Sequence, residues 1–496
     1  MRDPGDRYRR AGENVPPPPG WLRTRNLLWP ALGFVALMAM PPGAAIALMA
    51  LGVTARTAWR AVGHVRARNA RIAARAAMGP TIAIGRDDSG HVVEVPERTL
   101  AAHGLILGAT GAGKSTTLLA LLGDQIKRGH PVVAIDLKGS PAFADDLRAA
   151  AEAAGRDLVL WTPDGPSHWN PLAAGNATEL KDKLLGTERF TEPHYRRAAE
   201  RYLQLAIQVA QEAAPGRPLT LSGVVELMTP ERLAAASRRA SRARAEQVGD
   251  YLGSLTSDQN SAVRGLASRL AVLTESHTGP LLEPGPADRT LDLRRALRGG
   301  EVVLFSLNSS TYGGLASMLG TLAVQDLVAA AGARLTNGAG QLPRAVVAID
   351  EFSALHSDNV LSLLARGREA GVGVLLATQE LADLDRAGRG VREQILGNTA
   401  LKIAHRQDVP ESAAAVARLA GTTRVWEASY QRRGGPSQFA GGQVSTSARL
   451  VDRHRVEPEL ISTLRTGEAL VVIKSPSASA QITRIRRRTN APDIGR

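Results

Sequence analysis

The longest uninterrupted run of hydrophobic residues lies near the N-terminus. No charged residue occurs between Arg25 and Arg56, and residues 27–53 are apolar almost throughout. A helix needs roughly 20 apolar residues to cross a bilayer, so this run predicts a transmembrane anchor within residues 27–58. A cleaved signal peptide is the alternative, but the run is long for one, and an arginine-rich segment follows it in place of a cleavage site.

The anchor is interrupted at its middle by the sequence Pro41-Pro42-Gly43. Because proline breaks the helical hydrogen-bond pattern, the run forms either one kinked span or a tight helical hairpin. Arginines cluster on both flanks, and positive flanks tend to stay in the cytoplasm, so we favour the hairpin. The polar, proline-rich residues 1–26 predict an arm without a fold, and residues 59–78 predict a basic juxtamembrane helix.

From residue 79 onward, short apolar strands alternate with amphipathic helices. The segments TIAIG and HVVEV, on either side of an Asp-Ser-Gly turn, predict a β-hairpin. Later strands are apolar along their length and end in polar residues, at Asp136, Asp350, Gln379 and His405. This alternation predicts an α/β domain with a mostly parallel sheet and helices on both faces.

Residues 178–290 break the alternation. Apolar residues recur there at spacings of three and four, as in RRAAERYLQLAIQVAQEAA and SAVRGLASRLAVLTE, which indicates helices. We interpret this part as an all-helical domain inserted into the α/β domain. The first half of the α/β domain then spans residues 79–177, and its second half spans residues 291–496.

Composition and charge narrow the functional possibilities. The 496 residues contain no cysteine, which excludes disulfides and thiolate metal sites. The net charge of +14 is uneven: residues 1–78 hold 12 arginines against three acids, residues 424–496 hold 13 basic residues against six acids, and the middle is close to neutral. Nucleic acid bound by the middle must therefore meet local patches. Residues 232–244 and 484–488 are two arginine-rich candidates, and a solvated face is the alternative for both.

Residues 108–115 read GATGAGKS and fit the P-loop pattern at every fixed position, with an apolar strand before them and a helical pattern after them. Such a loop surrounds phosphate groups with backbone N–H groups at a helix N-terminus. In a P-loop, Lys114 contacts the β- and γ-phosphates of ATP and Ser115 binds Mg²⁺. A dinucleotide site with Asp136 on the ribose is the rival interpretation, but the glycine spacing is wrong for it. The predicted nucleotide contacts are Gly108, Ala109, Thr110, Gly111, Ala112, Gly113, Lys114, Ser115 and Thr116.

Two later strands supply the remaining groups that ATP hydrolysis needs. RAVVAIDEF ends in Asp350, a predicted ligand of the Mg²⁺ shell, and Glu351, which is placed to polarise the attacking water. GVGVLLATQE ends in Gln379, which we expect to touch the γ-phosphate or the water and to sense hydrolysis. The alternative for Gln379 is a cap on the next turn.

With these motifs in this order, the chain resembles the type IV coupling proteins, the conjugative DNA-transfer ATPases within the FtsK and HerA class of DNA pumps. The family usually shows Pro and Glu where this chain has Leu137 and Ser140. The segments that carry the resemblance are His103, Asp136-Leu137-Lys138-Gly139, Trp169-Asn170-Pro171-Leu172, Asp350-Glu351, Gln379 and the tail residues 459–473.

The resemblance implies a RecA-like P-loop ATPase that forms a homohexamer, with ATP at the subunit interfaces and DNA in the channel, bound without sequence preference. It also implies a bacterial inner-membrane location and contacts with a relaxase or relaxosome and with secretion-channel components. The family supplies an arginine finger from the neighbouring subunit shortly before the strand of the glutamine. Arg368 matches that position, Arg366 is its nearest competitor, and Arg406 is a candidate second contact of the γ-phosphate.

Three functions follow from these observations. The first is an ATP-driven DNA translocase that serves conjugation or type IV secretion. The second is an FtsK- or HerA-like pump for chromosomal or plasmid DNA, with the same chemistry. The third is a secretion ATPase that acts as a receptor for protein cargo, a group that usually strings several ATPase domains together, whereas this chain has one P-loop.

Overall fold

The arm, the membrane anchor and the juxtamembrane helix predicted from the sequence lie outside the residues that the structure describes, apart from Pro41. Among the described residues, one helix, α13 (Ser309–Thr336), is long and apolar enough to span a membrane, but 72% of its apolar window is buried inside the protein. It packs against other helices, so we assign it to the core. The computed structural model describes Pro41 and residues 79–486, except 189, 191, 300, 337, 339, 341, 356, 433–443 and 476–477.

The chain divides into two compact units, which are described separately. The larger unit comprises residues 82–413 and 459–496, and the smaller one comprises residues 1–81 and 414–458. The larger unit contains the predicted P-loop and the strands that surround it.

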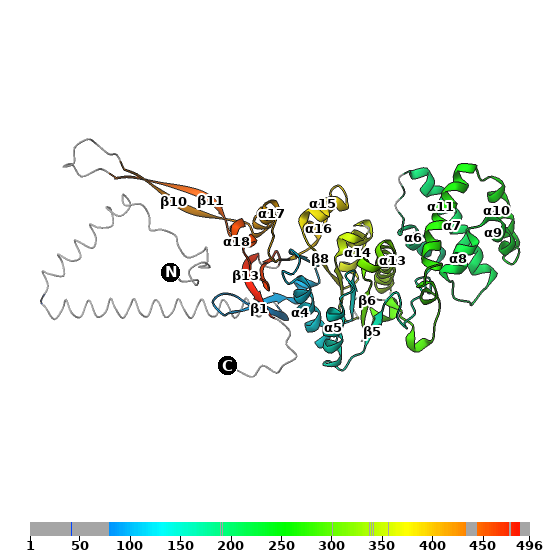
Figure 1. Ribbon diagram of the computed structural model, residues 1–496, viewed down its shortest axis with the longest axis horizontal. Coiled ribbons are helices and arrows are strands. Elements are labelled where there is room, and N and C mark those ends of the chain that lie inside the picture. The colour runs from blue at the N-terminus through cyan, green and yellow to red at the C-terminus, as the bar shows by residue number, and fades with distance from the viewer. Residues whose placement is uncertain are drawn as a thin grey trace. The chain divides into compact units, whose positions relative to one another are not determined.

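An 11-stranded sheet forms the centre of the larger unit (Figure 1). The strands from β9 to β5 run parallel to one another, whereas β12 is antiparallel to β9 and β13, and β13 is antiparallel to β1. The predicted mixed α/β fold with a mostly parallel sheet is therefore confirmed. In spatial order the strands are β2 (Val92–Pro96), β1 (Thr81–Arg86), β13 (Ser479–Ile485), β12 (Glu468–Ile473), β9 (Leu401–Ala404), β3 (Gly104–Leu107), β8 (Val372–Thr378), β7 (Ala345–Asp350), β4 (Val132–Asp136), β6 (Val302–Ser306) and β5 (Leu158–Trp161).

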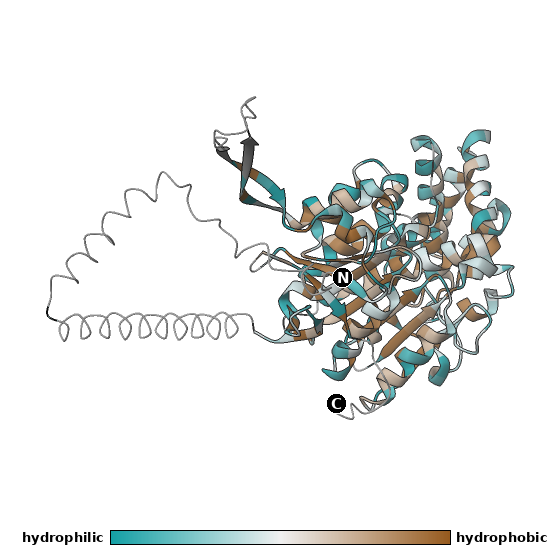
Figure 2. Ribbon diagram, turned by 60° about the vertical axis from the view of Figure 1, so that its left-hand side comes forward, coloured by the Kyte–Doolittle hydropathy of each residue, from teal (hydrophilic) through white to brown (hydrophobic). Residues whose placement is uncertain are grey.

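Helices cover both faces of this sheet. The connections through α4 (Lys114–Lys127) and α5 (Pro141–Glu152) run one way along the strand order, and those through α13 and α14 (Ser357–Glu369) run back. Because such crossovers are right-handed, the two pairs of helices lie on opposite faces. Figure 2 shows largely apolar strands, in brown, flanked by helices in which hydrophilic and hydrophobic residues are mixed.

Six of the helices between β5 and β6, α6 to α11, gather at one end of the larger unit (Figure 1). α7 is their centre and packs against α6, α8, α9 and α11. Reciprocal side-chain caps begin two of the helices, from Asn176 and Glu179 for α6 and from Thr256 and Gln259 for α11. The helices are α6 (Ala177–Leu185), α7 (Pro193–Ala213), α8 (Leu221–Leu227), α9 (Pro230–Ser237), α10 (Arg242–Gly253) and α11 (Ser257–Thr274).

The Trp-Asn-Pro-Leu element joins this helical part to the sheet. Trp169 is fully buried, with its ring against Phe305 of β6 at a centroid distance of 5.0 Å. Its indole N–H donates to Asp326 of α13 at 3.0 Å, and the ammonium of Lys183 in α6 pairs with the same carboxylate at 2.7 Å. A buried ion pair that also accepts an indole hydrogen bond is costly to break, so this junction is firmly held.

The smaller unit contains a two-stranded antiparallel ribbon, β10 (Thr422–Arg432) with β11 (Val444–His454). Trp426 and Leu450 are directly opposite each other in this ribbon and are 45% and 43% exposed. The sequence pattern did not predict the ribbon, and these residues were expected to belong to the second half of the α/β domain. In chain order, α17 (Pro410–Ala420) precedes the ribbon and α18 (Pro458–Ser462) follows it.

Candidate nucleotide site

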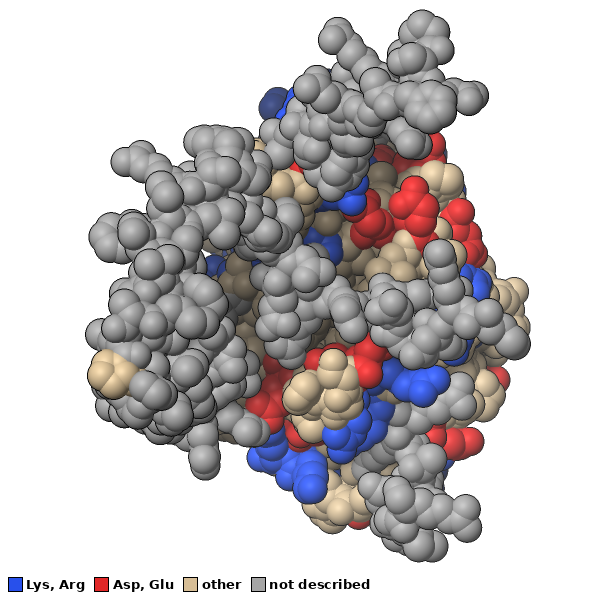
Figure 3. Space-filling model, turned by 90° about the vertical axis from the view of Figure 1, so that its left-hand side faces the viewer, with Lys and Arg blue, Asp and Glu red and all other residues tan. Residues whose placement is uncertain are grey.

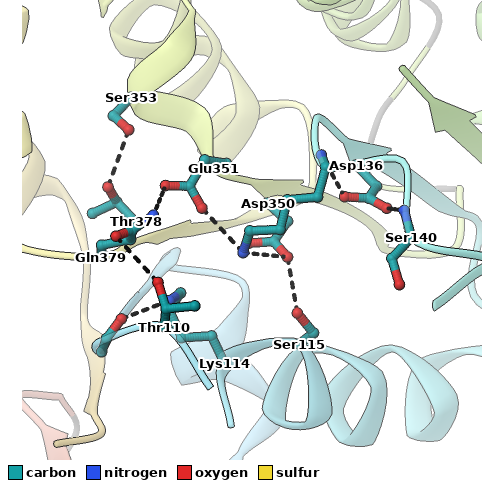
Figure 4. A network of polar contacts seen from close by, with 12 residues as sticks. Thr110, Lys114, Ser115, Asp136, Ser140, Asp350, Glu351, Ser353, Thr378 and Gln379 are labelled. Carbon is teal, nitrogen blue, oxygen red and sulfur yellow. Dashed lines mark hydrogen bonds and ion pairs between the residues drawn. The ribbon is translucent and has the colours of Figure 1, made fainter. Parts of the chain in front are cut away.

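The carboxyl ends of the parallel strands meet at one edge of the sheet. β3 leads there into the loop of residues 108–113, while β4 and β7 end at Asp136 and Asp350 and β8 ends just before Gln379. Open α/β sheets bind ligands beyond the carboxyl ends of their strands. The P-loop and the predicted residues at the ends of these strands are therefore brought to one place, as Figure 4 shows.

The P-loop adopts a conformation that its glycines permit. Gly111 and Gly113 have φ angles of 75° and 117°, in the left-handed region that disfavours other residues. The ammonium of Lys114 donates to the carbonyl oxygens of Gly108 at 2.5 Å and Ala109 at 3.3 Å. Burial, together with the positive charge of Lys138, lowers the pKa of Lys114. The ammonium therefore lies inside the loop, where the phosphates are expected.

Two residues that sequence reasoning missed pack against this loop. A Cβ at Gly108 would lie 2.7 Å from the Cβ of His405, so only glycine fits there. The imidazole of His405 is fully buried, with Nε2 2.8 Å from the hydroxyl of Thr117 and Nδ1 2.9 Å from the carbonyl of Glu468. The N–H of Gly467 donates to the carbonyl of Ala112 at 3.1 Å. The ends of β9 and β12 thus support the P-loop from behind.

Ser115 and Asp350, the predicted Mg²⁺ ligands, are in contact. The hydroxyl of Ser115 donates to Oδ2 of Asp350 at 3.0 Å (Figure 4). A hydroxyl and one carboxylate suit Mg²⁺, which completes its shell with water and nucleotide phosphates and does not need an all-protein cage. The described residues hold no cluster of three or more His, Cys, Asp or Glu side chains suited to a metal.

Lys138 adds a positive charge beside Asp350. Its ammonium lies 3.4 Å from Oδ1 of Asp350 and 3.0 Å from Oε2 of Glu351. Burial acts to lower the pKa of Lys138, but the two carboxylates outweigh it and the pKa is raised. From the sequence, Lys138 had no predicted role beyond its place in the Asp-Leu-Lys-Gly segment that carries the family resemblance.

Asp136 shapes the turn that presents Lys138. Its carboxylate accepts hydrogen bonds from the backbone N–H groups of Lys138 at 2.9 Å and Ser140 at 2.7 Å. Gly139, between them, has a φ of 64° and lies so close to Asn308 that a Cβ would be 2.5 Å from the Asn308 side chain. Asp136 is thus committed to its own turn, which disfavours the ribose-binding role of the rival interpretation.

Glu351 and Gln379 face each other across neighbouring strands. The amide of Gln379 donates to Oε1 of Glu351 at 3.0 Å, and the hydroxyl of Thr110 in the P-loop lies 3.4 Å from Oε1 of Gln379. Glu351 has φ 60° and ψ 40°, a left-handed conformation that is uncommon for residues other than glycine. Such strain costs about 1–3 kcal/mol and clusters at functional sites.

Arg368 lies far from the P-loop of its own chain. It is exposed in the last turn of α14, just before β8 begins, whereas Gln379 follows the end of β8. The seven residues of β8 span roughly 23 Å at about 3.3 Å per residue. Arg368 and the P-loop are therefore at opposite edges of the sheet, and Arg368 cannot reach a nucleotide bound to the same chain.

Arg366, the competitor for the finger, and Arg406, the candidate second contact of the γ-phosphate, are placed differently. Arg366 is exposed and lines a cavity of about 920 Å³ between the helical part and α13 and α14. Arg406 is close to the nucleotide site, where its carbonyl accepts from the N–H of Ala109 at 3.0 Å and its guanidinium pairs with Asp408 at 2.7 Å. Of these three candidate arginines, Arg406 is thus the one that lies close to the nucleotide site of its own chain.

Three of the five arginines in residues 232–244 form ion pairs with neighbouring glutamates. Arg232 pairs with Glu226 at 3.0 Å, Arg242 with Glu246 at 2.8 Å, and Arg244 with Glu212 at 2.8 Å. These ion pairs favour the interpretation of a solvated helical surface over that of a free basic stripe.

Two family models match parts of the chain. The model described as the FtsK/SpoIIIE family matches residues 66–133, and the model described as the TraM recognition site of TraD and TraG matches residues 344–466. No protein with a curated description matches the chain by sequence.

Solved structures of conjugation proteins share the fold. The unbound form of the bacterial conjugative coupling protein TrwB has a TM-score of 0.61 at 17% identity, covering 83% of this chain and 90% of that one. TrwB with ADP and Mg²⁺ has a TM-score of 0.58 at 18% identity, with 80% and 89% covered. VirB4 of Thermoanaerobacter pseudethanolicus has a TM-score of 0.52 at 17% identity, with 84% and 97% covered. The chain therefore has the P-loop α/β fold of TrwB, and with the two family models this confirms the resemblance to type IV coupling proteins.

Proposed function

We propose that this chain is the coupling ATPase of a conjugative or type IV secretion system, which hydrolyses ATP to move DNA across a bacterial envelope. The observation that carries the proposal is the continuous set of contacts at the mouth of the P-loop, from Ser115 through Asp350 and Lys138 to Glu351 and Gln379. The TrwB-like fold and the two family-model matches support the same conclusion.

The P-loop side of the site binds the nucleotide. Backbone N–H groups of residues 108–113 surround the phosphates, and Lys114 needs only to turn from its carbonyl partners to contact the β- and γ-phosphates. Ser115 and Asp350 would hold Mg²⁺, which neutralises charge on the phosphates when it is bound. TrwB has been solved with ADP and Mg²⁺ and with an ATP analogue that cannot be hydrolysed, which supports this choice of ligands.

The opposite side of the site activates water. Glu351 accepts the proton of the attacking water, while the water oxygen bonds to the γ-phosphorus and the bond to the bridging oxygen of ADP breaks. Gln379 donates to Glu351 at 3.0 Å, so it holds the carboxylate in place and lies beside the water. Lys138 pairs with the same carboxylate and keeps it oriented away from bulk solvent.

The position of Arg368 supports a ring. Since Arg368 lies at the edge of the sheet opposite its own P-loop, it acts as a finger only on the nucleotide of a neighbouring subunit. A homohexamer with ATP at each interface places site and finger together. An arginine suits this role because its planar cation stabilises the charge that develops on the transferred phosphoryl group.

The membrane, the protein partners and the DNA are proposed to contact other parts of the chain. Residues 27–58 anchor it in the inner membrane, and the part of residues 344–466 that matches the TraM-recognition model is where a relaxase, another relaxosome protein or a channel component docks. Basic and acidic side chains lie next to each other on the face in Figure 3. Because the middle of the chain is close to neutral, the proposed DNA contacts are few, made to the backbone, and independent of sequence.

ATP hydrolysis by the full-length protein in detergent tests this proposal. DNA should raise the rate for the wild type and leave a Lys114→Ala control inactive. A pump of the FtsK or HerA kind would give the same response and is separated by its neighbouring genes, since a relaxase gene favours conjugation. If DNA of any form leaves the rate unchanged while a secreted protein raises it, the cargo-receptor function is correct instead.

A further inference from the structure

His103 is a buried titratable residue that the proposed chemistry does not use. It is 2% exposed and lies in the turn between α3 (Glu97–Leu100) and β3, with a left-handed φ of 63°. A residue other than glycine persists in this conformation only where its surroundings hold it there. Both of its ring nitrogens have partners: the N–H of Val374 in β8 donates to Nδ1 at 3.0 Å, and Nε2 lies 2.9 Å from the carbonyl of Leu364 in α14.

The contact with Val374 decides which nitrogen carries the proton. A backbone N–H can only donate, so Nδ1 accepts, and Nε2 donates its proton to Leu364. Burial lowers the pKa of His103 to about 4, against the hydrogen bond to Leu364 and with the help of the charge of Arg368. The ring is therefore neutral near pH 7 and makes both hydrogen bonds at once.

The hydrogen bond to Leu364 acts on the turn that carries Arg368. An α-helix pairs the N–H of residue i with the carbonyl of residue i−4, and Leu364 precedes Arg368 by four residues. His103 thus binds the carbonyl that closes the helical turn of Arg368. At Gly367, in the same turn, an added Cβ would lie 3.5 Å from Cε1 of His103, so this turn of the helix packs against the edge of the ring.

The strand β3 joins this contact to the nucleotide site. Its four residues, Gly104–Leu107, run from His103 to Gly108, the first residue of the P-loop. At about 3.3 Å per residue, β3 spans roughly 13 Å. One end of this short strand holds the chain's own P-loop, and the other end holds the helix that carries Arg368.

We propose that His103 is a positioning residue for Arg368. Through Leu364 it fixes the last turn of α14 to the strand that leads into the P-loop, and so it links a subunit's own nucleotide site to the finger that it offers to the next subunit. This inference rests on the proposed function, in which Arg368 acts on a neighbouring subunit.

Two substitutions separate the two hydrogen bonds of the ring. His103→Asn keeps an oxygen near the position of Nδ1 for the Val374 amide and tolerates a positive φ, but it is too short to reach Leu364. His103→Gln keeps an N–H near the position of Nε2 for Leu364 and leaves the Val374 amide unpaired. We expect His103→Asn to lower DNA-stimulated hydrolysis about 10- to 100-fold, as a misplaced catalytic group does, with ATP binding unchanged, and His103→Gln to retain more activity.

Mixed rings give a readout that a folding defect would not produce. Two full-length variants with different tags are co-expressed, and complexes that carry both tags are isolated in detergent. His103→Asn mixed with Lys114→Ala should recover activity, because the first supplies an intact P-loop and the second a correctly held finger. His103→Asn mixed with Arg368→Ala should not exceed the two proteins measured alone, because neither supplies such a finger.

The role of His103 is overturned if His103→Asn mixed with Arg368→Ala recovers activity, or if His103→Asn mixed with Lys114→Ala does not. The mixture of Lys114→Ala with Arg368→Ala is the reference. If that reference recovers while the His103 mixtures behave otherwise than expected, the proposed function stands and only this inference is wrong. If the reference itself does not recover, the finger between subunits is wrong, and the role of His103 falls with it.

Discussion

The side-chain amide of Gln379 donates a hydrogen bond of 3.0 Å to Glu351, which joins the ends of the neighbouring strands β8 and β7. Because Thr110 of the P-loop lies 3.4 Å from the same amide group, a change at the phosphates has a short path to the carboxylate that is expected to activate water. The pair thus brings three separate segments of the chain to one reaction centre.

Glu351→Gln should bind ATP as tightly as the wild type and hydrolyse it about 10²- to 10⁴-fold more slowly, because an amide cannot accept the proton of the water. Lys114→Ala should instead lose tight ATP binding, because it removes the cation that contacts the phosphates. Equilibrium binding and steady-state hydrolysis, measured on both variants, separate the two roles. Wild-type turnover by Glu351→Gln would mean that another residue activates the water.

Arg368→Ala should keep nucleotide binding and lose hydrolysis by a large factor, since arginine fingers contribute about 10³- to 10⁵-fold. Arg366→Ala is the matched control, because this arginine is also exposed on α14, two residues earlier, and faces the cavity beside the helical part. Hydrolysis and ATP affinity of the two variants are compared under the same conditions. Equal losses in both would show that the charge of α14, and not the position of Arg368, matters.

The residues of the candidate site could be proposed from the sequence because their signals are local. The P-loop spacing identifies Lys114 and Ser115, and a parallel sheet brings strand-terminal residues such as Asp350 and Gln379 to the same edge whatever their separation in sequence. The mostly parallel sheet could be predicted from the alternation of apolar strands and amphipathic helices along the chain. The family resemblance implies an arginine finger at Arg368. In the structure, Arg368 lies away from the P-loop of its own chain.

The supporting contacts were beyond the reach of sequence patterns. Lys138 meets Asp350 across 212 residues, and His405 meets Thr117 across 288 residues, and no local spacing encodes such pairs. The ribbon β10–β11 was missed for another reason. An isolated two-stranded ribbon has no fully buried face, so its residues lack the clear alternation of apolar and polar positions that marks a half-buried strand.

Acidic pH should destabilise the protein through His405. Burial, with the charge of Lys114, lowers the pKa of this imidazole from 6.5 to about 4, against the hydrogen bond to Glu468. His405 is therefore protonated below about pH 6.5 in the unfolded chain but stays neutral in the folded chain until about pH 4. As the pH falls from 6.5 to 4, the free energy of unfolding decreases by about 3 kcal/mol in total.

Thermal unfolding of the full-length protein between pH 7 and pH 4.5 measures this loss. His405→Gln should be less stable at pH 7 but should lose less on acidification, with some slope left because the pKa of His103 is lowered in the same way. An unchanged slope in His405→Gln would show that His405 is not the group that titrates.

The helical hairpin predicted in residues 27–58 would place both the extreme N-terminus and the motor in the cytoplasm. Because the chain has no cysteine, a single cysteine near residue 5 gives a clean probe. We expect it to stay unlabelled by a membrane-impermeant thiol reagent in intact cells and to react after lysis. Labelling in intact cells would refute the hairpin and support a single span.

The response to DNA should depend on salt in a way that reports the number of phosphate contacts. Each contact with duplex DNA steepens the fall of affinity with salt by roughly 0.9 in a log–log plot. The middle of the chain is close to neutral, and Arg232, Arg242 and Arg244 are paired with glutamates. We therefore expect a modest slope and no dependence on sequence.

Stimulation of hydrolysis by DNA should fade as salt rises, over the same range in which DNA binding is lost. ATP binding has to be measured at each salt concentration, because weaker ATP binding would lower the rate of hydrolysis just as weaker DNA binding does. The full-length protein is needed, since residues 1–78 carry 12 arginines and their removal would lower the slope by itself. A steep slope in a protein that lacks those residues would reveal a basic DNA path through the motor. It would also contradict the proposal that the motor makes few contacts with the backbone.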